Sequence, residues 1–289
     1  MANGRPPVIV IGMHRSGTSM LGRLMVDQGY FPGARLQSND HHEALFFQNL
    51  NRWIYAQAGA DWDHPSGLRA LVDTPTSREL IADYLDLSLR SPRALDFLGP
   101  KRFARYRSVQ GITEPWGWKD PRTTFTLPFW LDVFPDAKIV HVKRHGVDVA
   151  NSLVVRRRRL LEEAAQSYRK RRLMYLVRPR LSGFAPGVQM TSLDAGLDLW
   201  DAYVSESDRH VEALGDRAME LRFEDLLDEP TKTLTALAEF CDLRTTTTDG
   251  RPLGDGIRRD RGAAYLTDPE LNEFARSRAE TLAKHGYTP

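Results

Sequence analysis

The alternation of apolar and polar residues along the chain predicts short strands separated by long helices. Short segments rich in apolar and β-branched residues predict strands at 8–11, 138–143 and 219–223. Apolar residues at helical spacing predict helices at about 43–58, 77–91, 147–177, 193–214, 230–241 and 268–285. Strands that alternate with long helices form parallel sheets with right-handed crossovers. We therefore expect an α/β fold with a parallel β-sheet flanked by helices.

The domain organisation follows from length and composition. No internal repeat and no linker-like segment divides the 289 residues, so we expect a single domain over 1–289. Hydrophobic residues make up 41% and charged residues 27%, as in folded globular proteins. The net charge of +2 implies no particular partner. Basic residues are nevertheless concentrated around 155–195, where we expect a helical lid or an acceptor-binding insertion.

Cysteine content and hydropathy bear on the location of the protein. The single cysteine, Cys241, rules out an internal disulfide and suits a reducing compartment. The apolar run near the N-terminus is too short for a signal-peptide core or a membrane span. No later apolar run reaches spanning length. These observations predict a cytoplasmic protein.

A glycine-bounded loop, Gly12–Ser19, follows the first predicted strand and leads into a predicted helix. In this context backbone N–H groups and a helix N-terminus hold phosphate groups. The spacing fits G-x-x-x-x-G-K-[ST], except that Thr18 stands in place of the lysine. That lysine reaches the β- and γ-phosphates of ATP. The loop therefore predicts a nucleotide without a γ-phosphate, and Arg15 can supply the positive charge.

A second group of polar residues follows the strand predicted at 138–143. Arg144 comes directly after this strand, and Ser152 and Arg156 lie four residues apart in the next helix. Residues at this spacing share one helix face, so Ser152 and Arg156 can bind one anion together with Arg144. The alternative is that Arg144 is a solvated charge at the end of a strand.

Both groups resemble motifs of the sulfotransferase family. Gly12–Ser19 is similar to the family's 5′-phosphosulfate loop in its R-S-G-T-S form. Arg144 and Ser152 have the spacing of the 3′-phosphate motif, and Arg156 matches the extended version found in the tyrosyl-protein branch.

Two further segments support the resemblance. Trp116–Arg122 is similar to the K-D-P segment of the tyrosyl-protein branch. Leu221–Leu227 is similar to the Y-E-D-L segment, although Phe223 replaces its tyrosine, which the family places near the adenine. The four motifs occur in the family's order over about residues 8–230.

The resemblance implies a fold related to the P-loop nucleotide kinases. It also implies 3′-phosphoadenosine 5′-phosphosulfate (PAPS) as the sulfuryl donor, 3′,5′-ADP as the product and no metal. The residues that it assigns to donor binding are His14, Arg15, Ser16, Gly17, Thr18, Ser19, Arg144, Ser152, Arg156 and Phe223.

Sulfuryl transfer needs a base for the acceptor hydroxyl and positive charge near the leaving oxygen. The resemblance assigns the base to Glu43, with His41 and His42 as competing candidates. It matches Lys119 to the lysine that stabilises the leaving group, and Arg15 covers the 5′ sulfate and phosphate oxygens. The alternatives are that Glu43 only complements a helix N-terminus and that Lys119 is a surface lysine.

The acceptor is expected to be a hydroxyl on a carbohydrate or a lipid-linked molecule. Trp53, Tyr55 and Trp62 could form an aromatic platform for a sugar, or could belong to the core. The basic region Arg156–Arg172 could bind an acidic polysaccharide or touch a membrane surface transiently, or could be a solvated helix. Nucleic acid is not expected, because no aromatic interleaving and no known binding motif accompany the basic residues.

Two other classes of function remain open on the sequence. A P-loop kinase or NTPase is disfavoured by Thr18 and by the lack of a clear acidic Mg²⁺ ligand at a strand end. A non-enzymatic protein that binds a polyanion or a membrane surface would rely on the basic region alone.

Overall fold

The computed structural model describes residues 4–37, 43–178, 189–254, 257 and 263–289. The chain divides into two compact units. The first unit comprises Met1–Arg144 and Tyr203–Gly262, and the second comprises His145–Ala202 and Ala263–Pro289. The sequence pattern predicts one domain over 1–289, and this stays a prediction.

The first unit contains a parallel sheet, as predicted. Within the described residues the strands are β1 (Val8–Ile11), β2 (Gly117–Lys119), β3 (Lys138–Lys143) and β4 (Ala218–Arg222). They form one sheet in the order β2-β1-β3-β4, and every neighbouring pair is parallel. The predicted strands at 8–11 and 138–143 are confirmed, and the third lies one residue earlier than predicted.

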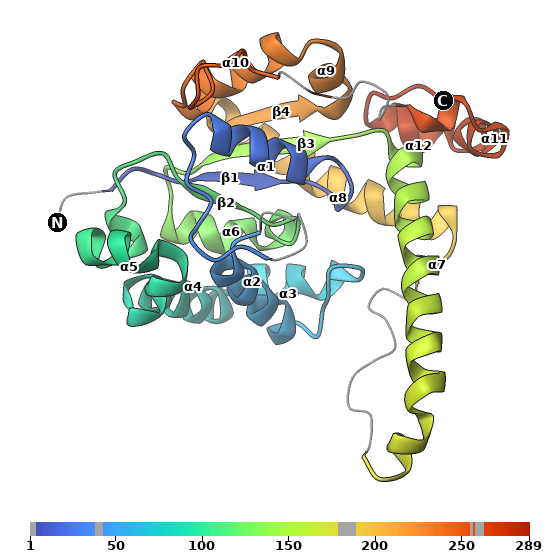
Figure 1. The fold of residues 1–289 in the computed structure, drawn as a ribbon, viewed down its shortest axis with the longest axis horizontal. Coiled ribbons are helices and arrows are strands. Elements are labelled where there is room, and N and C mark those ends of the chain that lie inside the picture. The colour runs from blue at the N-terminus through green and yellow to red at the C-terminus, as the bar shows by residue number, and fades with distance from the viewer. Residues whose placement is uncertain (1–3, 38–42, 179–188, 255–256, 258–262) are drawn as a thin grey trace. The chain divides into compact units, whose positions relative to one another are not determined.

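Helices cover both faces of this sheet (Figure 1). The helices of the first unit are α1 (Thr18–Asp27), α2 (Leu45–Gln57), α3 (Leu68–Asp73), α4 (Pro75–Arg90), α5 (Leu95–Tyr106), α6 (Thr123–Val133), α9 (Phe223–Asp228), α10 (Pro230–Cys241) and the later part of α8 (Leu193–Leu214). Successive side chains of a strand point to opposite faces. Ile9 and Ile11 accordingly pack with α2, α4, α5 and α6, whereas Val8 and Val10 pack with α1 and α10. This burial on both faces explains the unbroken apolar run of β1.

The sequence pattern does not reveal β2, α3, α5 or α6. Strand β2 has only three residues, too few for a periodic signal. Helix α6 contains Pro128 and three threonines, which disfavour a helix, yet most of its residues are buried in the core. No helix among the described residues combines the length and the apolar character needed to cross a bilayer.

The second unit is helical in its described residues. It contains α7 (Gly146–Arg171), a 3₁₀ helix η4 (Arg172–Leu176), the start of α8, α11 (Pro269–Ser277) and α12 (Ala279–Lys284). The helix predicted over 147–177 thus changes to 3₁₀ geometry after Arg171, and the one predicted over 268–285 is interrupted at Arg278.

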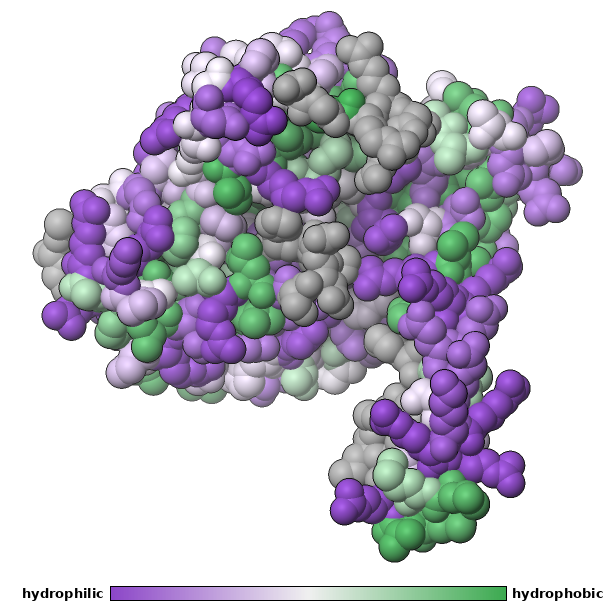
Figure 2. Space-filling view, in the orientation of Figure 1, coloured by the Kyte–Doolittle hydropathy of each residue, from purple (hydrophilic) through white to green (hydrophobic). Residues whose placement is uncertain are grey.

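The two ends of α7 differ in their surroundings. At its start a Cβ on Gly146 would lie 2.7 Å from Leu197 and 2.8 Å from Trp200 of α8, so a larger residue would force these side chains to move. At its far end apolar side chains gather at the surface, as Figure 2 shows. Helix α7 is therefore anchored through its first turns.

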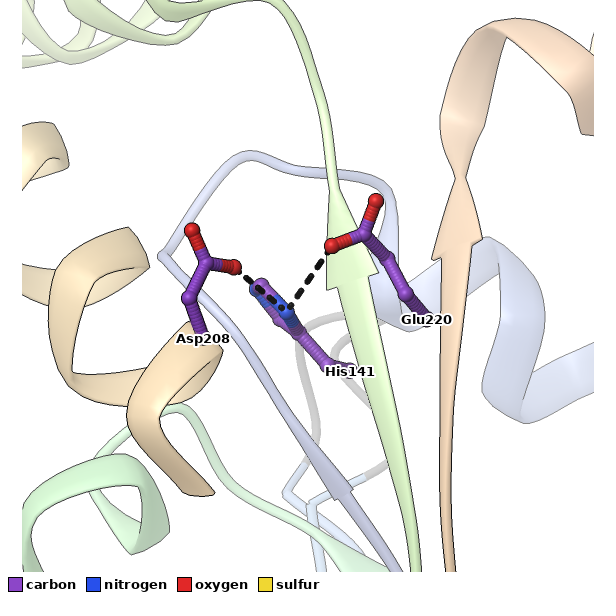
Figure 3. Close-up of side chains that lie close together, drawn as sticks. All are labelled: His141, Asp208 and Glu220. Carbon is purple, nitrogen blue, oxygen red and sulfur yellow. Dashed lines mark ion pairs between the residues drawn. The ribbon is translucent and has the colours of Figure 1, made fainter. Parts of the chain in front are cut away.

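Charged residues connect α8 to the sheet within the first unit. The buried His141 of β3 lies between Asp208 of α8 and Glu220 of β4 (Figure 3). The three could together supply ligands to a cation. The Nζ atom of Lys143 already donates to both carboxylates, at 3.2 Å to Asp208 and 3.1 Å to Glu220. A cation here would compete with that ammonium group, so we regard the cluster as an ion-pair network that fixes α8.

Candidate functional site

The parallel sheet places the predicted donor-binding loop beside other predicted site residues. Carboxyl ends of parallel strands meet at one edge, where ligands bind in open α/β sheets. Gly12 follows β1, Lys119 ends β2 and Arg144 follows β3. The Gly12 N–H donates to Thr124 Oγ1 of α6 at 3.1 Å. A Cβ at Gly12 would lie 2.3 Å from the carbonyl oxygen of Val142, so the loop enters this edge through a glycine.

The loop itself is shaped to hold an anion. Arg15 (φ 74°) and Gly17 (φ 92°) have left-handed backbone conformations on either side of Ser16. Such turns direct backbone N–H groups into one concavity. Helix α1 then begins at Thr18, and among the described residues no side chain caps its N-terminus. The buried hydroxyl of Ser16 has no hydrogen-bond partner in the described part of the chain, as expected of a group that binds a ligand oxygen.

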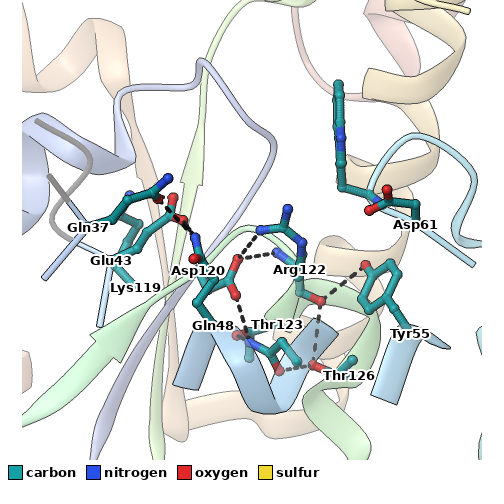
Figure 4. A network of polar contacts seen from close by, with 12 residues as sticks. Gln37, Glu43, Gln48, Tyr55, Asp61, Lys119, Asp120, Arg122, Thr123 and Thr126 are labelled. Atoms are coloured by element: carbon teal, nitrogen blue, oxygen red, sulfur yellow. Dashed lines mark hydrogen bonds and ion pairs between the residues drawn. The ribbon is translucent and has the colours of Figure 1, made fainter. Parts of the chain in front are cut away.

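Lys119 joins the loop to Glu43. Its Nζ atom lies 3.0 Å from Glu43 Oε1 and 3.2 Å from Ser19 Oγ. Lys119 is only 3% exposed and Glu43 5% exposed, so the ion pair is buried. Gln48 of α2 donates to the other carboxylate oxygen of Glu43 at 2.5 Å. A carboxylate, an ammonium group and a loop hydroxyl therefore lie in one hydrogen-bonded chain. Figure 4 shows Glu43, Gln48 and Lys119 of this chain.

A second set of buried polar residues holds the segment after Lys119. Asn51 Nδ2 of α2 donates to Asp120 Oδ2 and to Thr123 Oγ1, each at 2.9 Å. The Asn51 side-chain oxygen accepts from Thr126 and from Trp130, both at 2.8 Å. Each polar group of the amide is thus satisfied inside the core. This network fixes α2 against α6 and holds the backbone next to Lys119 (Figure 4).

Asp120 and Arg122 form a buried charged pair in the same segment. Burial raises the pKa of the Asp120 carboxyl above its ordinary value, and the neighbouring Arg122 guanidinium opposes this shift. Arg122 Nη1 lies 3.5 Å from Asp120 Oδ1, and no described residue accepts a hydrogen bond from Arg122 Nε. Tyr55 donates to the Arg122 carbonyl at 3.2 Å. This geometry gives Arg122 an ion pair with Asp120.

Arg144 and Phe223 lie against the loop. The Arg144 guanidinium is 4.8 Å from the centre of the Phe223 ring, and its Nη1 is 3.5 Å from the Arg15 carbonyl oxygen. A Cβ on Gly17 would lie 2.2 Å from the same ring, so Phe223 packs directly against the loop at Gly17. The Phe223 side chain is buried. The predicted contact of Phe223 with adenine stays a prediction.

Ser152 and Arg156 belong to α7, in the second unit. They lie one turn apart on that helix, as predicted, with Ser152 half-buried and Arg156 exposed. Their role at the 3′-phosphate stays a prediction. Arg157 is buried, so the basic region Arg156–Arg172 is not solvated along its whole length.

The structure decides some of the open alternatives by position. Glu43 precedes α2, which begins at Leu45, and its carboxylate pairs with Lys119, so neither side chain is a surface charge. His41 and His42 lie outside the described residues. Tyr55 is buried, so it cannot form a platform for a sugar.

The other two aromatic residues of the predicted platform differ. Trp53 packs on Tyr84 at the edge of the core, with ring centres 4.2 Å apart. Trp62 is half-buried, and its ring centre lies 4.9 Å from that of His14 in the loop. Tyr203 donates to the Trp62 carbonyl at 2.8 Å. Only Trp62 thus lies beside the loop.

Asn51 and Gln48 are site residues that the sequence did not indicate. Both lie on the buried face of α2, among Phe47, Leu50 and Ile54. The one available signal for these two residues was their position as polar residues on the apolar face of a predicted helix. That signal did not identify the residues to which they hydrogen-bond.

Comparisons with known proteins identify a family and a fold. Residues 6–247 match the profile of a family described as "Sulfotransferase family". No curated protein matches the chain. Among solved structures, a sulfotransferase from Alicyclobacillus acidocaldarius has a TM-score of 0.50 and 17% identity, and the match covers 98% of this chain and 94% of that one. The sulfotransferase domain of the Synechococcus PCC 7002 olefin synthase has a TM-score of 0.47 and 17% identity, with coverage of 100% and 97%. At this identity the likeness to the first structure establishes a common fold.

Proposed function

We propose, because this chain belongs to the sulfotransferase family, that it transfers a sulfuryl group from PAPS to an acceptor hydroxyl. The observation that carries the proposal is the buried chain from Glu43 through Lys119 to Ser19, with distances of 3.0 and 3.2 Å. It joins a base to the loop predicted to hold the 5′ end of the donor.

The loop is suited to such a donor. A sulfate–phosphate group needs many hydrogen-bond donors and little room for side chains. These needs are met by Gly12 and Gly17, and by the start of α1 and the Ser16 hydroxyl, which have no cap and no partner among the described residues. Arg15 and Arg144 supply positive charge beside the loop. Thr18 in place of a P-loop lysine favours a donor without a γ-phosphate over ATP.

In the proposed mechanism Glu43 removes the proton from the acceptor hydroxyl as its oxygen attacks the sulfur. The new O–S bond forms while the bond between sulfur and the bridging oxygen of the donor breaks. Lys119 stabilises the negative charge that develops on this oxygen, which leaves with 3′,5′-ADP. The Glu43–Lys119 pair therefore holds the base and the leaving-group cation within one hydrogen bond of each other.

The acceptor that we propose is a carbohydrate hydroxyl. Support comes from Glu43, which the resemblance matches to a glutamate of the tyrosyl-protein and carbohydrate-type enzymes, and from Trp62, which lies half-buried against His14. Aromatic faces are common in ligand pockets. We also propose a cytoplasmic location, which agrees with the buried free thiol of Cys241.

Substitution of Glu43 tests the chemical role. Labelled PAPS and a panel of saccharides, tyrosine peptides and lipid-linked sugars identify the acceptor first. With that acceptor, Glu43→Gln should lower kcat about 10²–10⁴-fold and leave the affinity for 3′,5′-ADP unchanged, because only the base is lost. Glu43→Asp should recover part of the rate, since it restores a carboxylate.

Two controls accompany this test. Glu79→Gln changes an exposed glutamate of α4 and should leave the rate unchanged. A joint His41→Ala and His42→Ala variant should also keep its rate. If this histidine variant loses the activity and Glu43→Gln keeps it, the base has been assigned to the wrong residue.

A further inference from the structure

Apolar side chains are exposed together at the far end of α7. Leu173 is 71% exposed, Leu176 83% and Val177 84%, and Met174 is also exposed. We call these four residues of η4 and the position after it the apolar tip. Figure 2 shows hydrophobic side chains gathered at the end of the helix. Soluble proteins seldom leave so many neighbouring large apolar side chains in water without a binding role.

Basic residues surround the apolar tip in sequence. Residues 164–178 contain five basic residues and no acidic one. These residues, which we call the basic collar, are exposed: Arg169, Lys170, Arg171, Arg172 and Arg178. No ion pair within the described chain involves any of them. Earlier in α7 the situation differs, because Arg159 pairs with Glu163 at 2.9 Å.

A contact between two tyrosines holds the apolar tip on the end of α7. The rings of Tyr168 in α7 and Tyr175 in η4 stack with their centres 5.7 Å apart and their planes 13° apart. This contact fixes η4 on the last turns of α7. Helix α7 has 26 residues, a length of about 39 Å at 1.5 Å per residue. Its first turns pack within the second unit, and the apolar tip lies at the opposite, exposed end of the same helix.

These features match a lipid surface. Four apolar residues are far too few to span a bilayer, which needs about 20. They can enter the boundary between headgroups and acyl chains, where tyrosines are also favoured. The basic collar can then bind anionic headgroups, and its charge is complementary to them. A protein partner would instead need an apolar groove lined with acidic residues.

We propose that the apolar tip and basic collar dock the protein on an anionic lipid bilayer, with Leu173, Leu176 and Val177 inserted at its surface. The sequence alone suggested a membrane contact through Arg156–Arg172. The structure moves this contact toward the end of the helix, because Arg157 is buried and Arg159 is paired. This proposal does not rest on the proposed sulfuryl transfer.

Flotation of the full chain with lipid vesicles tests the docking. Wild-type protein should float with vesicles that contain phosphatidylglycerol and not with phosphatidylcholine alone, and high salt should release it. A Leu173→Ser, Leu176→Ser, Val177→Ser variant should bind at least about tenfold more weakly, since apolar contacts with the bilayer are lost. The matched control, Leu80→Ser with Leu87→Ser, removes exposed leucines of α4 and should float as the wild type does.

The charges are tested separately. Arg169→Gln, Lys170→Gln and Arg171→Gln together should weaken binding about 100-fold, given about tenfold per one to two charges. Because all substituted side chains are exposed, each variant should keep the wild-type melting temperature. Three results would overturn the proposal: no flotation of the wild type, equal flotation of the Leu173 triple variant, or an apolar-tip-dependent dimer that ignores vesicles.

Discussion

Lys119 carries its charge inside the protein, and its two partners determine what the ammonium group can do. Removing two charges from water is costly, and a buried ion pair is often no more stabilising than apolar residues of similar volume. Lys119 and Glu43 are nevertheless both almost fully buried. Ser19 connects the pair to the anion-binding loop at 3.2 Å. A position so costly in desolvation is better explained by chemistry on a bound anion than by stability.

Arg144 provides a test at the level of one side chain. Arg144→Ala should weaken binding of 3′,5′-ADP at least about tenfold, because one charge-assisted hydrogen bond contributes about 1.5–3 kcal/mol. The affinity for AMP, which lacks the 3′-phosphate, should change little. Calorimetric titration of both nucleotides measures the difference, with Arg52→Ala, an exposed arginine of α2, as control. An equal loss for the two nucleotides would contradict a role at the 3′-phosphate.

Helices α2 and α6 show how elements place the site. The sequence predicted α2, because its apolar residues recur at helical spacing. The sequence did not predict α6, since Pro128 and the threonines of this segment disfavour a helix. Burial in the core, which the sequence does not show, outweighs that preference. Asn51 joins the two helices to the segment of Lys119 through four hydrogen bonds. No periodic signal reveals such a residue, because its partners come from another part of the chain.

Asn51→Ala should lower the free energy of unfolding by about 3 kcal/mol or more. The substitution leaves the Trp130 N–H, the Thr126 hydroxyl and the Asp120 carboxylate without this partner, and each buried unsatisfied group costs about 1–3 kcal/mol. Chemical denaturation measures the loss. Gln57→Ala, an exposed change in the same helix, should stay within about 0.5 kcal/mol of the wild type. Equal stability of the two variants would mean that the network does not hold α2 to α6.

At the scale of the whole molecule, the order of motifs along the chain was enough to predict the architecture. Parallel strands bring Gly12, Lys119 and Arg144 to one edge of a sheet, although they lie far apart in the sequence. The sequence therefore indicated the donor loop and its neighbours. It did not indicate the exposed apolar tip after α7, because Leu173 and Leu176 fall within the helix predicted over 147–177 and look like ordinary residues of it.

The central claim is that the chain binds a nucleotide with phosphate groups on both ends of its ribose and no γ-phosphate. Calorimetric titration of the wild-type protein with 3′,5′-ADP, and separately with ATP and Mg²⁺, tests it most directly. We predict that 3′,5′-ADP binds at least about tenfold more tightly than ATP, since Thr18 replaces the lysine that reaches a γ-phosphate. Tight binding of ATP with Mg²⁺, together with no binding of 3′,5′-ADP, would contradict the claim.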